Sequence, residues 1–252
     1  MKTTFFSTLM VIIISVNAYS QAADSLFVAG NNAYAQGNYK ESLRLYEKVL
    51  DKGYMSEAVY FNLANSHYKL NNVAESIYFY EKAKKLDPSD PAIKNNLTYA
   101  EQMRVDEIEA LPQPEVKELT KETALALSLT SWSWIAIISG FLAFGSFIVY
   151  FLRSKTAQKR LFFTLFVTFS FTGLASHLMA STQERIIQNS QYAIIFPEEI
   201  KVYAEPNPKS ERLFMLHEGT KVSVESEFNE FSKIKLKDGS TGWTRSSYFK
   251  EL

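Results

Sequence analysis

Three histidines are the side chains in this sequence whose chemistry most often serves catalysis or metal binding. They are His67, His177 and His217, and the 252-residue chain contains no cysteine. They lie far apart along the chain, and no nucleophile or glycine-rich phosphate loop accompanies any of them. The lack of cysteine excludes disulfides and thiolate chemistry. We therefore expect no catalytic site, no metal site and no cofactor.

The charge balance of the chain argues against nucleic acid as a partner. The 27 basic residues equal the 27 acidic ones, so the formal net charge is zero, and the sequence shows no basic stripe. Apolar residues are instead concentrated at the N-terminus and between Trp132 and Met179. This distribution predicts soluble modules attached to a membrane.

The first 22 residues have the pattern of a secretion signal. Lys2 precedes an apolar run over residues 5–16, and small residues follow up to Ala22. The run is short for a membrane span, which favours a cleaved signal peptide over residues 1–22; an uncleaved anchor is the alternative. In either case the domain that follows is expected outside the cytoplasm.

Residues 23–110 contain a sequence that repeats with a period of 34. Gly30 aligns with Ala64 and Tyr46 with Tyr80, and each unit has two helical patterns separated by a short polar turn. Small residues recur where helices must approach closely, and aromatic residues recur where the helix pair must be filled. This pattern resembles the tetratricopeptide repeat family, whose period is 34 residues.

The resemblance implies an all-α solenoid of two repeats, and a third helix over about residues 91–108 is expected to cap it. At least three repeats are usually needed for independent stability. We therefore predict that this module is marginally stable alone or docks onto something. His67 and an aromatic stripe are expected to pack inside repeat two rather than to bind a ligand. The stripe consists of Tyr60, Phe61, Tyr68, Tyr78, Phe79 and Tyr80.

The same resemblance implies a peptide-binding groove lined by the first helix of each repeat. Asparagine amides suit such a groove because they both donate to and accept from a peptide backbone; a solvated polar face is the alternative. A clamp for a C-terminal carboxylate is not expected, because two positions that carry cations in members with such a clamp do not carry them here. The groove residues are expected to be Phe27, Asn31, Asn62, Asn65 and Asn96.

Two uncharged stretches, residues 131–152 and 161–180, are each long enough to cross a hydrocarbon core of ~30 Å at ~1.5 Å per residue. The loop between them, residues 153–160, contains four cations and no acidic residue. The positive-inside rule places this loop in the cytoplasm. Both flanking domains, joined to the hairpin by linkers at 111–130 and 181–190, are then expected on the periplasmic side of a bacterial inner membrane.

Small residues at a spacing of four would allow the two transmembrane helices to approach closely. Packing within the hairpin is favoured over association with another membrane protein. The residues expected to pack are Ala136, Gly140, Thr168, Thr172 and Ser176.

From residue 191 to 252 the hydrophobic period changes to two, which predicts an all-β domain of short strands. Residues 238–239, Asp-Gly, are a hairpin turn signal. The turn at 218–222 and the Gly-Trp pair that ends at Trp243 resemble the bacterial SH3-like family, which implies a small barrel. We expect Trp243 to pack the barrel and the His217-Glu218 pair to be solvated.

The complete order of modules resembles the BatE proteins of the Bacteroides aerotolerance group. That resemblance implies von Willebrand factor A membrane proteins and a MoxR-type ATPase as partners, and a role in envelope stress tolerance. The expected function is a membrane scaffold that binds proteins through its repeats and its barrel. A cell-wall sensor that binds peptidoglycan through the barrel is the alternative, and an enzyme would require a catalytic cluster assembled across modules.

Overall fold

The computed structural model describes residues 23–112, 114–188 and 191–252. It divides into two compact units, one formed by the chain up to Leu111 together with residues 191–252, the other by residues 112–190. The first unit is therefore assembled from segments that flank the second unit in the sequence. The predicted signal peptide, residues 1–22, lies outside the described residues.

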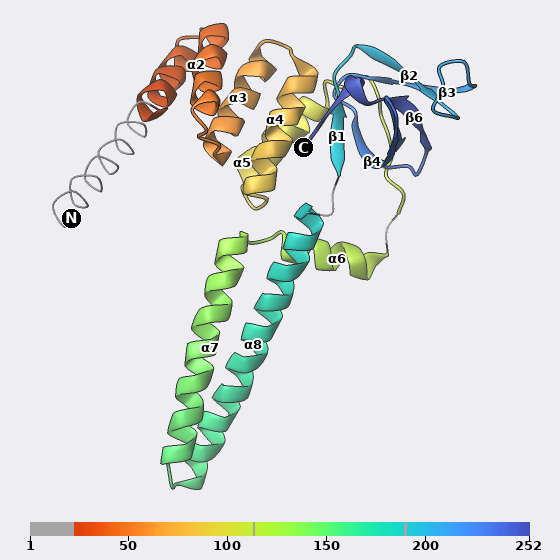
Figure 1. Cartoon of the computed structure of the whole chain (residues 1–252). Helices are drawn as coiled ribbons and strands as arrows, with labels where there is room; N and C mark the ends of the chain where they lie inside the picture. Colours follow the sequence, from red (N-terminus) through yellow and green to blue (C-terminus); the bar gives the residue numbers. More distant parts are fainter. Residues whose placement is uncertain (1–22, 113, 189–190) are drawn as a thin grey trace, which may run out of the picture. The chain divides into compact units, whose positions relative to one another are not determined.

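Within residues 23–112, the helical part of the first unit consists of two helix pairs and one further helix (Figure 1). We call residues 23–101 the solenoid. A helix over residues 23–35 packs with α2 (Tyr39–Asp51), α3 (Glu57–Lys69) packs with α4 (Val73–Leu86), and α5 (Pro91–Glu101) follows. Ser56 caps the N-terminus of α3, where its hydroxyl accepts from the Val59 amide, and Asp90 caps α5, where its carboxylate accepts from the Ala92 amide. These caps satisfy amides that have no partner within the helix.

The turn inside each helix pair has the same backbone geometry. Gly37 (φ 79°) and Asn71 (φ 60°) both lie in the left-handed region that glycine and asparagine tolerate best. The two residues are one period of 34 apart, because 71 − 37 = 34. The predicted pair of repeats is therefore confirmed at the level of individual turns.

The repeat positions expected to be small or aromatic form the solenoid core. Tyr46 and Tyr80 are each 1% exposed, and a Cβ atom on Gly30 would lie 2.5 Å from the Tyr46 ring. His67 is buried and stacks on Phe79 with ring centroids 5.5 Å apart, and burial lowers its pKa. The aromatic stripe lies within or against the buried clusters of the repeats, so its side chains pack there as expected.

The C-terminal part of the first unit, which we call the barrel, is a seven-stranded antiparallel sheet with strand order β3-β2-β6-β5-β4-β1-β7. A 3-10 turn over Ser246–Tyr248 precedes β7. The predicted hairpin turn joins β5 to β6, with Gly239 at φ 89°. The strands are β1 (Tyr192–Ile195), β2 (Glu199–Tyr203), β3 (Arg212–His217), β4 (Lys221–Phe228), β5 (Phe231–Lys235), β6 (Thr241–Arg245) and β7 (Phe249–Glu251).

Trp243 lies on the outer face of β6, which differs from its expected place within the barrel. Its neighbours Gly242 and Thr244 are buried, and alternation along a strand turns Trp243 the other way. A Cβ atom on Gly242 would lie 2.5 Å from Cγ1 of Val202. The core therefore has room only for glycine at this point, and this sets which face the tryptophan occupies. Trp243 pairs across the strands with Tyr203 and Lys233.

The second unit contains α6 (Glu115–Ala124), α7 (Leu129–Leu152) and α8 (Thr156–Gln188), with α7 and α8 side by side in Figure 1. Two helices in the described part of the chain, α7 and α8, are long and apolar enough to cross a membrane. The turn between them is shorter than the predicted loop, because α8 begins at Thr156 and already includes Lys159 and Arg160.

Small residues line the contact between α7 and α8. Ser139, Ala143 and Ser146 on α7 are buried, and on α8 Ser176 is 2% exposed. A Cβ atom on Gly173 would lie 3.4 Å from Cβ of Ser139, so the helices approach closely there.

Only some of the residues predicted to pack lie in the contact between α7 and α8. Ser176 lies within it, and the carbonyl oxygen of Ala136 faces Gly173. Gly140 is exposed, but its backbone nitrogen borders the contact, 4.0 Å from a Cβ atom on Gly173. Thr168 and Thr172 are on exposed surface instead, and the Thr172 hydroxyl donates to the Thr168 carbonyl within α8. A spacing of four selects one helix side but does not determine which side meets the partner helix.

Candidate groove and barrel interface

Two identical hydrogen-bond ladders cross the first helices of the repeats. In the first, the Tyr46 hydroxyl donates to Oδ1 of Asn31 at 2.7 Å, and Nδ2 of Asn62 donates to the same oxygen at 2.9 Å. One period later the same bonds recur among Tyr80, Asn65 and Asn96, at 2.5 and 3.0 Å.

The ladders orient the asparagine amides. Because Oδ1 of Asn31 and of Asn65 accepts two hydrogen bonds, the Nδ2 donors of these two residues take no part in the ladders. Burial raises the pKa of Tyr46 to about 12 and also raises that of Tyr80, so both hydroxyls stay protonated and keep donating. The sequence predicted these asparagines as groove residues, but it did not predict the bonds among them.

A cavity of about 190 Å³ lies against the second ladder. Several groups of its lining can donate hydrogen bonds into it: the Lys69 ammonium group, Nδ2 of Asn65 and the hydroxyls of the three tyrosines other than Tyr80, whose own hydroxyl donates to Asn65. Such a lining is complementary to peptide carbonyls and to a carboxylate. The lining residues are Tyr34, Asn65, Tyr68, Lys69, Tyr80, Asn96 and Tyr99.

The cavity divides the predicted groove residues into two groups. Asn65 and Asn96 line it, whereas Asn31 and Asn62 form the ladder of repeat one. Phe27 packs in the core, with its ring centroid 5.8 Å from that of Tyr46.

Five of the seven cavity residues were not predicted as groove residues from the sequence. Tyr34 and Tyr68 are one period of 34 residues apart, and the same shift takes Asn65 to Tyr99. Extending the repeat alignment around the asparagines would therefore have found the tyrosines. Lys69 has no such counterpart, because Ala35 occupies the equivalent position.

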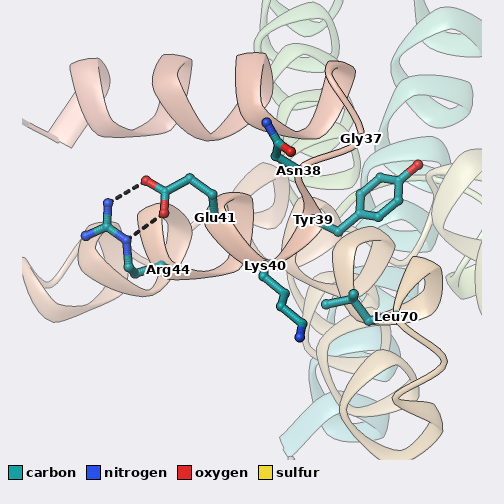
Figure 2. Close-up of a pocket in the computed structure, with 7 residues that line it drawn as sticks. All are labelled: Gly37, Asn38, Tyr39, Lys40, Glu41, Arg44 and Leu70. Atoms are coloured by element: carbon teal, nitrogen blue, oxygen red, sulfur yellow. Dashed lines mark hydrogen bonds and ion pairs between the residues drawn. The ribbon is translucent and has the colours of Figure 1, made fainter.

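A wider hollow of about 620 Å³ lies at the turn of repeat one, between the start of α2 and Leu70 (Figure 2). Arg44 and Glu41 form an exposed ion pair on its wall, and the Lys40 side chain extends away from that pair. Its charged groups thus pair with each other or point apart, so the hollow offers no convergent set of binding groups.

Removing the Tyr80 hydroxyl is expected to loosen the second ladder. Tyr80→Phe leaves the ring in place and should cost about 1 kcal/mol of unfolding free energy, the net value of one buried hydrogen bond. Urea unfolding measures this cost. Tyr99→Phe is the control, because Tyr99 is 57% exposed and outside the ladder; equal effects of the two changes would contradict a structural role of the ladder.

The barrel packs against the end of the solenoid within the first unit. Ala193 and Ile195 of β1 belong to the barrel core, whereas Ile194 between them belongs to the buried cluster of repeat two. Both faces of β1 are thus buried, and Ile194 is 0% exposed. The Tyr78 and Phe196 rings meet at the edge of this contact, with centroids 5.7 Å apart.

A buried ion pair crosses the same interface. Nζ of Lys221 on β4 lies 2.8 Å from a carboxylate oxygen of Glu81 on α4, and the two side chains are 15% and 8% exposed. Burial raises the pKa of Glu81, but the charge and hydrogen bond of Lys221 outweigh burial, so the pKa lies below its ordinary value. Glu81 is therefore ionised in the folded protein at neutral pH.

Asp106 forms a second polar contact to the barrel. Its Oδ2 atom accepts from the His217 amide at 2.7 Å and from the Thr220 hydroxyl at 2.6 Å, while Oδ1 lies 2.7 Å from Nδ1 of His217. Glu218 hydrogen-bonds to the backbone of Ala74 in the first turn of α4. The expectation that the His217-Glu218 pair is solvated was wrong, because this turn docks on the solenoid.

Residues 102–111, which we call the strap, connect the solenoid to the second unit along the barrel surface. Helix α5 ends at Glu101 rather than near residue 108 as expected. Ile108 packs against the barrel core, and the Leu111 amide donates to the Lys237 carbonyl at 3.1 Å. The strap residues contact the barrel instead of continuing the hydrogen-bond pattern of α5, and this explains why α5 ends early.

Acidification is expected to weaken this interface. Burial raises the pKa of Asp106, but the hydrogen bonds from Thr220 and His217 outweigh burial, so the pKa lies below its ordinary value. Such a carboxyl stabilises the fold fully above its unfolded pKa of about 3.9, and this contribution is lost as the pH falls through the folded pKa. Burial raises the pKa of Glu218, so protonation of this carboxyl stabilises the folded state as the pH falls and opposes the loss from Asp106.

Urea unfolding measured against pH should therefore show a loss of stability below about pH 4. Asp106→Asn should make that loss shallower. An unchanged acid profile in the variant would contradict the role given to Asp106.

Two family models match parts of the chain. Residues 27–91 match the tetratricopeptide repeat model, and residues 198–250 match the bacterial SH3 domain model. A comparison with curated proteins finds no match. Both matched families are non-catalytic interaction domains, which indicates protein–protein interaction or peptidoglycan binding. In residues 23–112, 114–188 and 191–252, no group of three or more acidic or histidine side chains could hold a metal ion.

Proposed function

We propose that this chain is a bacterial inner-membrane scaffold that binds an extended peptide segment of a partner protein in its solenoid groove. The observation that carries this proposal is the oriented amide ladder beside a donor-rich cavity. Peptide backbones offer carbonyl acceptors, to which Nδ2 of Asn65 and the hydroxyls of Tyr34, Tyr68 and Tyr99 can donate. Because Lys69 is the cation in the lining, a peptide with an acidic side chain near this point is favoured.

The two-part construction of the first unit supports a membrane-crossing hairpin. Buried contacts such as the Glu81–Lys221 pair join segments on either side of residues 112–190. If α7 and α8 cross a bilayer, both segments must lie on one side, because the contacts cannot form across it. The four cations at residues 153–160 favour the cytoplasm for the hairpin turn, and hence the periplasm for the first unit.

The absence of cysteine permits a direct test of this topology. Single changes Glu47→Cys in the solenoid, Lys209→Cys in the barrel and Ser154→Cys in the hairpin turn place one thiol in each region. In spheroplasts, a membrane-impermeant maleimide should label the first two and should label Ser154→Cys only after permeabilisation. Labelling of the turn in sealed spheroplasts, or protection of either domain, would overturn the proposed topology.

Crosslinking in the membrane followed by identification of the bound protein tests the groove. The resemblance to BatE proteins makes von Willebrand factor A membrane proteins and components of a MoxR-type ATPase system the first candidates. Asn65→Ala with Asn96→Ala should weaken capture, since each lost hydrogen bond costs about 1 kcal/mol. Asn95→Ala is the control, because Asn95 is an exposed neighbour on the same helix. Capture that survives replacement of all four groove asparagines would reject the groove.

A peptidoglycan-binding barrel is the second candidate function, and the outer position of Trp243 favours it. Trp243 and Tyr203 are cross-strand neighbours beside Lys233, and aromatic rings next to a cation suit sugars that carry acidic peptides. The purified chain should then co-sediment with murein, and Trp243→Ala should reduce this. Phe228→Ala is the control, since Phe228 is 55% exposed elsewhere on the barrel. No co-sedimentation of the unaltered chain rejects this function.

A further inference from the structure

The last repeat of a solenoid leaves an apolar face without a neighbour, and in this chain the barrel covers that face. The buried cluster of repeat two includes Ile77, Leu97 and Ala100 from the helices and Ile194 from β1. Each repeat in such an array buries its apolar surface only against adjacent units. We propose that the barrel is the closing element of the solenoid: residues 23–111 reach a stable fold only when residues 191–252 are docked on α4 and the strap.

Strand β1 shows how the barrel is adapted to this role. A strand in a small antiparallel barrel usually turns one face to the core and the other to water. In β1, Ala193 and Ile195 fill the barrel core, while Ile194 is fully buried on the opposite face, among solenoid residues. An aliphatic side chain on the outer face of a barrel is costly unless a partner covers it. Here the solenoid covers it.

Close approach at a turn supports the same inference. Gly219 has φ 79°, and a Cβ atom there would lie 2.9 Å from Cδ1 of Ile77 and 3.1 Å from Cγ1 of Val73. The backbone of the β3–β4 turn therefore rests directly on α4.

Polar contacts around the apolar patch define one docking orientation. Three sets of polar contacts surround it: the Glu81–Lys221 pair, the Asp106 contacts, and a hydrogen bond that Nζ of Lys85 donates to the Leu252 carbonyl at 3.0 Å. Buried charges tolerate few alternative arrangements, because a displaced partner leaves a charge unpaired. The interface is thus specific as well as apolar.

Because the barrel follows the solenoid in the chain, the dependence of the solenoid on the barrel also affects how the protein assembles. Domains generally fold from the N-terminus during synthesis, but here the closing element is made after both the solenoid and residues 112–190. The solenoid should then stay incompletely folded until the barrel has reached the same compartment. A chain with a misplaced barrel would carry an unstable solenoid, and therefore no working groove.

Hydrogen exchange and limited proteolysis of the full chain in detergent test the dependence. Ile194→Ser should speed cleavage and exchange within residues 23–111 by about tenfold or more, which corresponds to ~1.4 kcal/mol or more. Leu213→Ser is the matched control: it alters a leucine of the same barrel that is 47% exposed, and it should leave the solenoid protected. Exchange in β4–β6 reports separately whether the barrel itself remains folded.

A chain that ends at residue 190 gives the deciding comparison, because it lacks the barrel entirely. We expect its solenoid to be cleaved at least as fast as that of Ile194→Ser. If the solenoid of this shortened chain is as protected as in the full chain, the barrel is not its closing element and the proposal is overturned. That result would leave peptide binding by the groove untouched.

Discussion

Replacing Lys221 with methionine is expected to lower the unfolding free energy of the first unit by about 3–5 kcal/mol, the usual cost of breaking a buried ion pair from one side. Glu81 would remain 8% exposed with its cationic partner removed. It would then have to stay charged with only the charges of Lys84 and Lys237 to compensate it, or take up a proton, and both cost free energy. Urea unfolding at pH 7, followed by hydrogen exchange of α4, measures the loss.

A double-mutant cycle separates the ion pair from general damage to β4. Glu81→Gln together with Lys221→Met removes both charges, so the double variant should be more stable than Lys221→Met alone. Lys235→Met is the matched surface control: its Nζ lies 3.7 Å from Glu225 with 48% of the side chain exposed, and it should change stability by less than ~1 kcal/mol. Strictly additive effects in the cycle would show that Glu81 and Lys221 are not coupled.

The change Gly219→Val should open the interface by overfilling it. Valine at positive φ costs about 1–2 kcal/mol in backbone strain, and overpacking adds roughly 1–3 kcal/mol. The steric part arises because the new Cβ atom would meet Ile77, Val73 and Arg104 at 2.9–3.1 Å. We therefore expect a total loss of about 2–5 kcal/mol, with increased hydrogen exchange in α4 and the strap.

Gly53→Val supplies the control for the backbone part of that loss. Gly53 has φ 81°, nearly the same as Gly219, and a Cβ atom there meets nothing within 4 Å. It should therefore show only the strain of the positive φ. If the two valine variants lose equal stability, the β3–β4 turn does not press on the solenoid.

Regular patterns of the sequence were enough to predict most elements of both units. The predicted linkers were the exception, because α6 lies within residues 111–130 and α8 continues to Gln188. The 34-residue period predicted the two repeats, including buried Tyr46 and Tyr80, because each side chain in a repeat meets the same local neighbours. Alternation predicted the strands of the barrel, and uncharged length predicted α7 and α8. The period also relates Asn31 to Asn65 and Asn62 to Asn96, whereas their assignment to a groove is a prediction from the resemblance to the tetratricopeptide family. Such patterns depend on contacts within one element or between adjacent ones.

What the sequence did not reveal depends on contacts between distant segments. Asp106 and Thr220 are 114 positions apart, and no period relates a strap residue to a barrel turn. For the same reason α5 ends early, and His217 is held by Asp106 rather than solvated. Lys69 was missed for another reason: Ala35 occupies the equivalent position in repeat one, so the period does not reveal it.

The repeating and alternating patterns alone therefore determined which segments are helices and strands and which faces are apolar. Only the tertiary structure decided that the last apolar face of the solenoid is covered by the barrel. The physical reason is that burying an apolar face lowers the free energy with any surface of matching shape and charge. Which surface of the chain covers that face depends on how the whole chain packs.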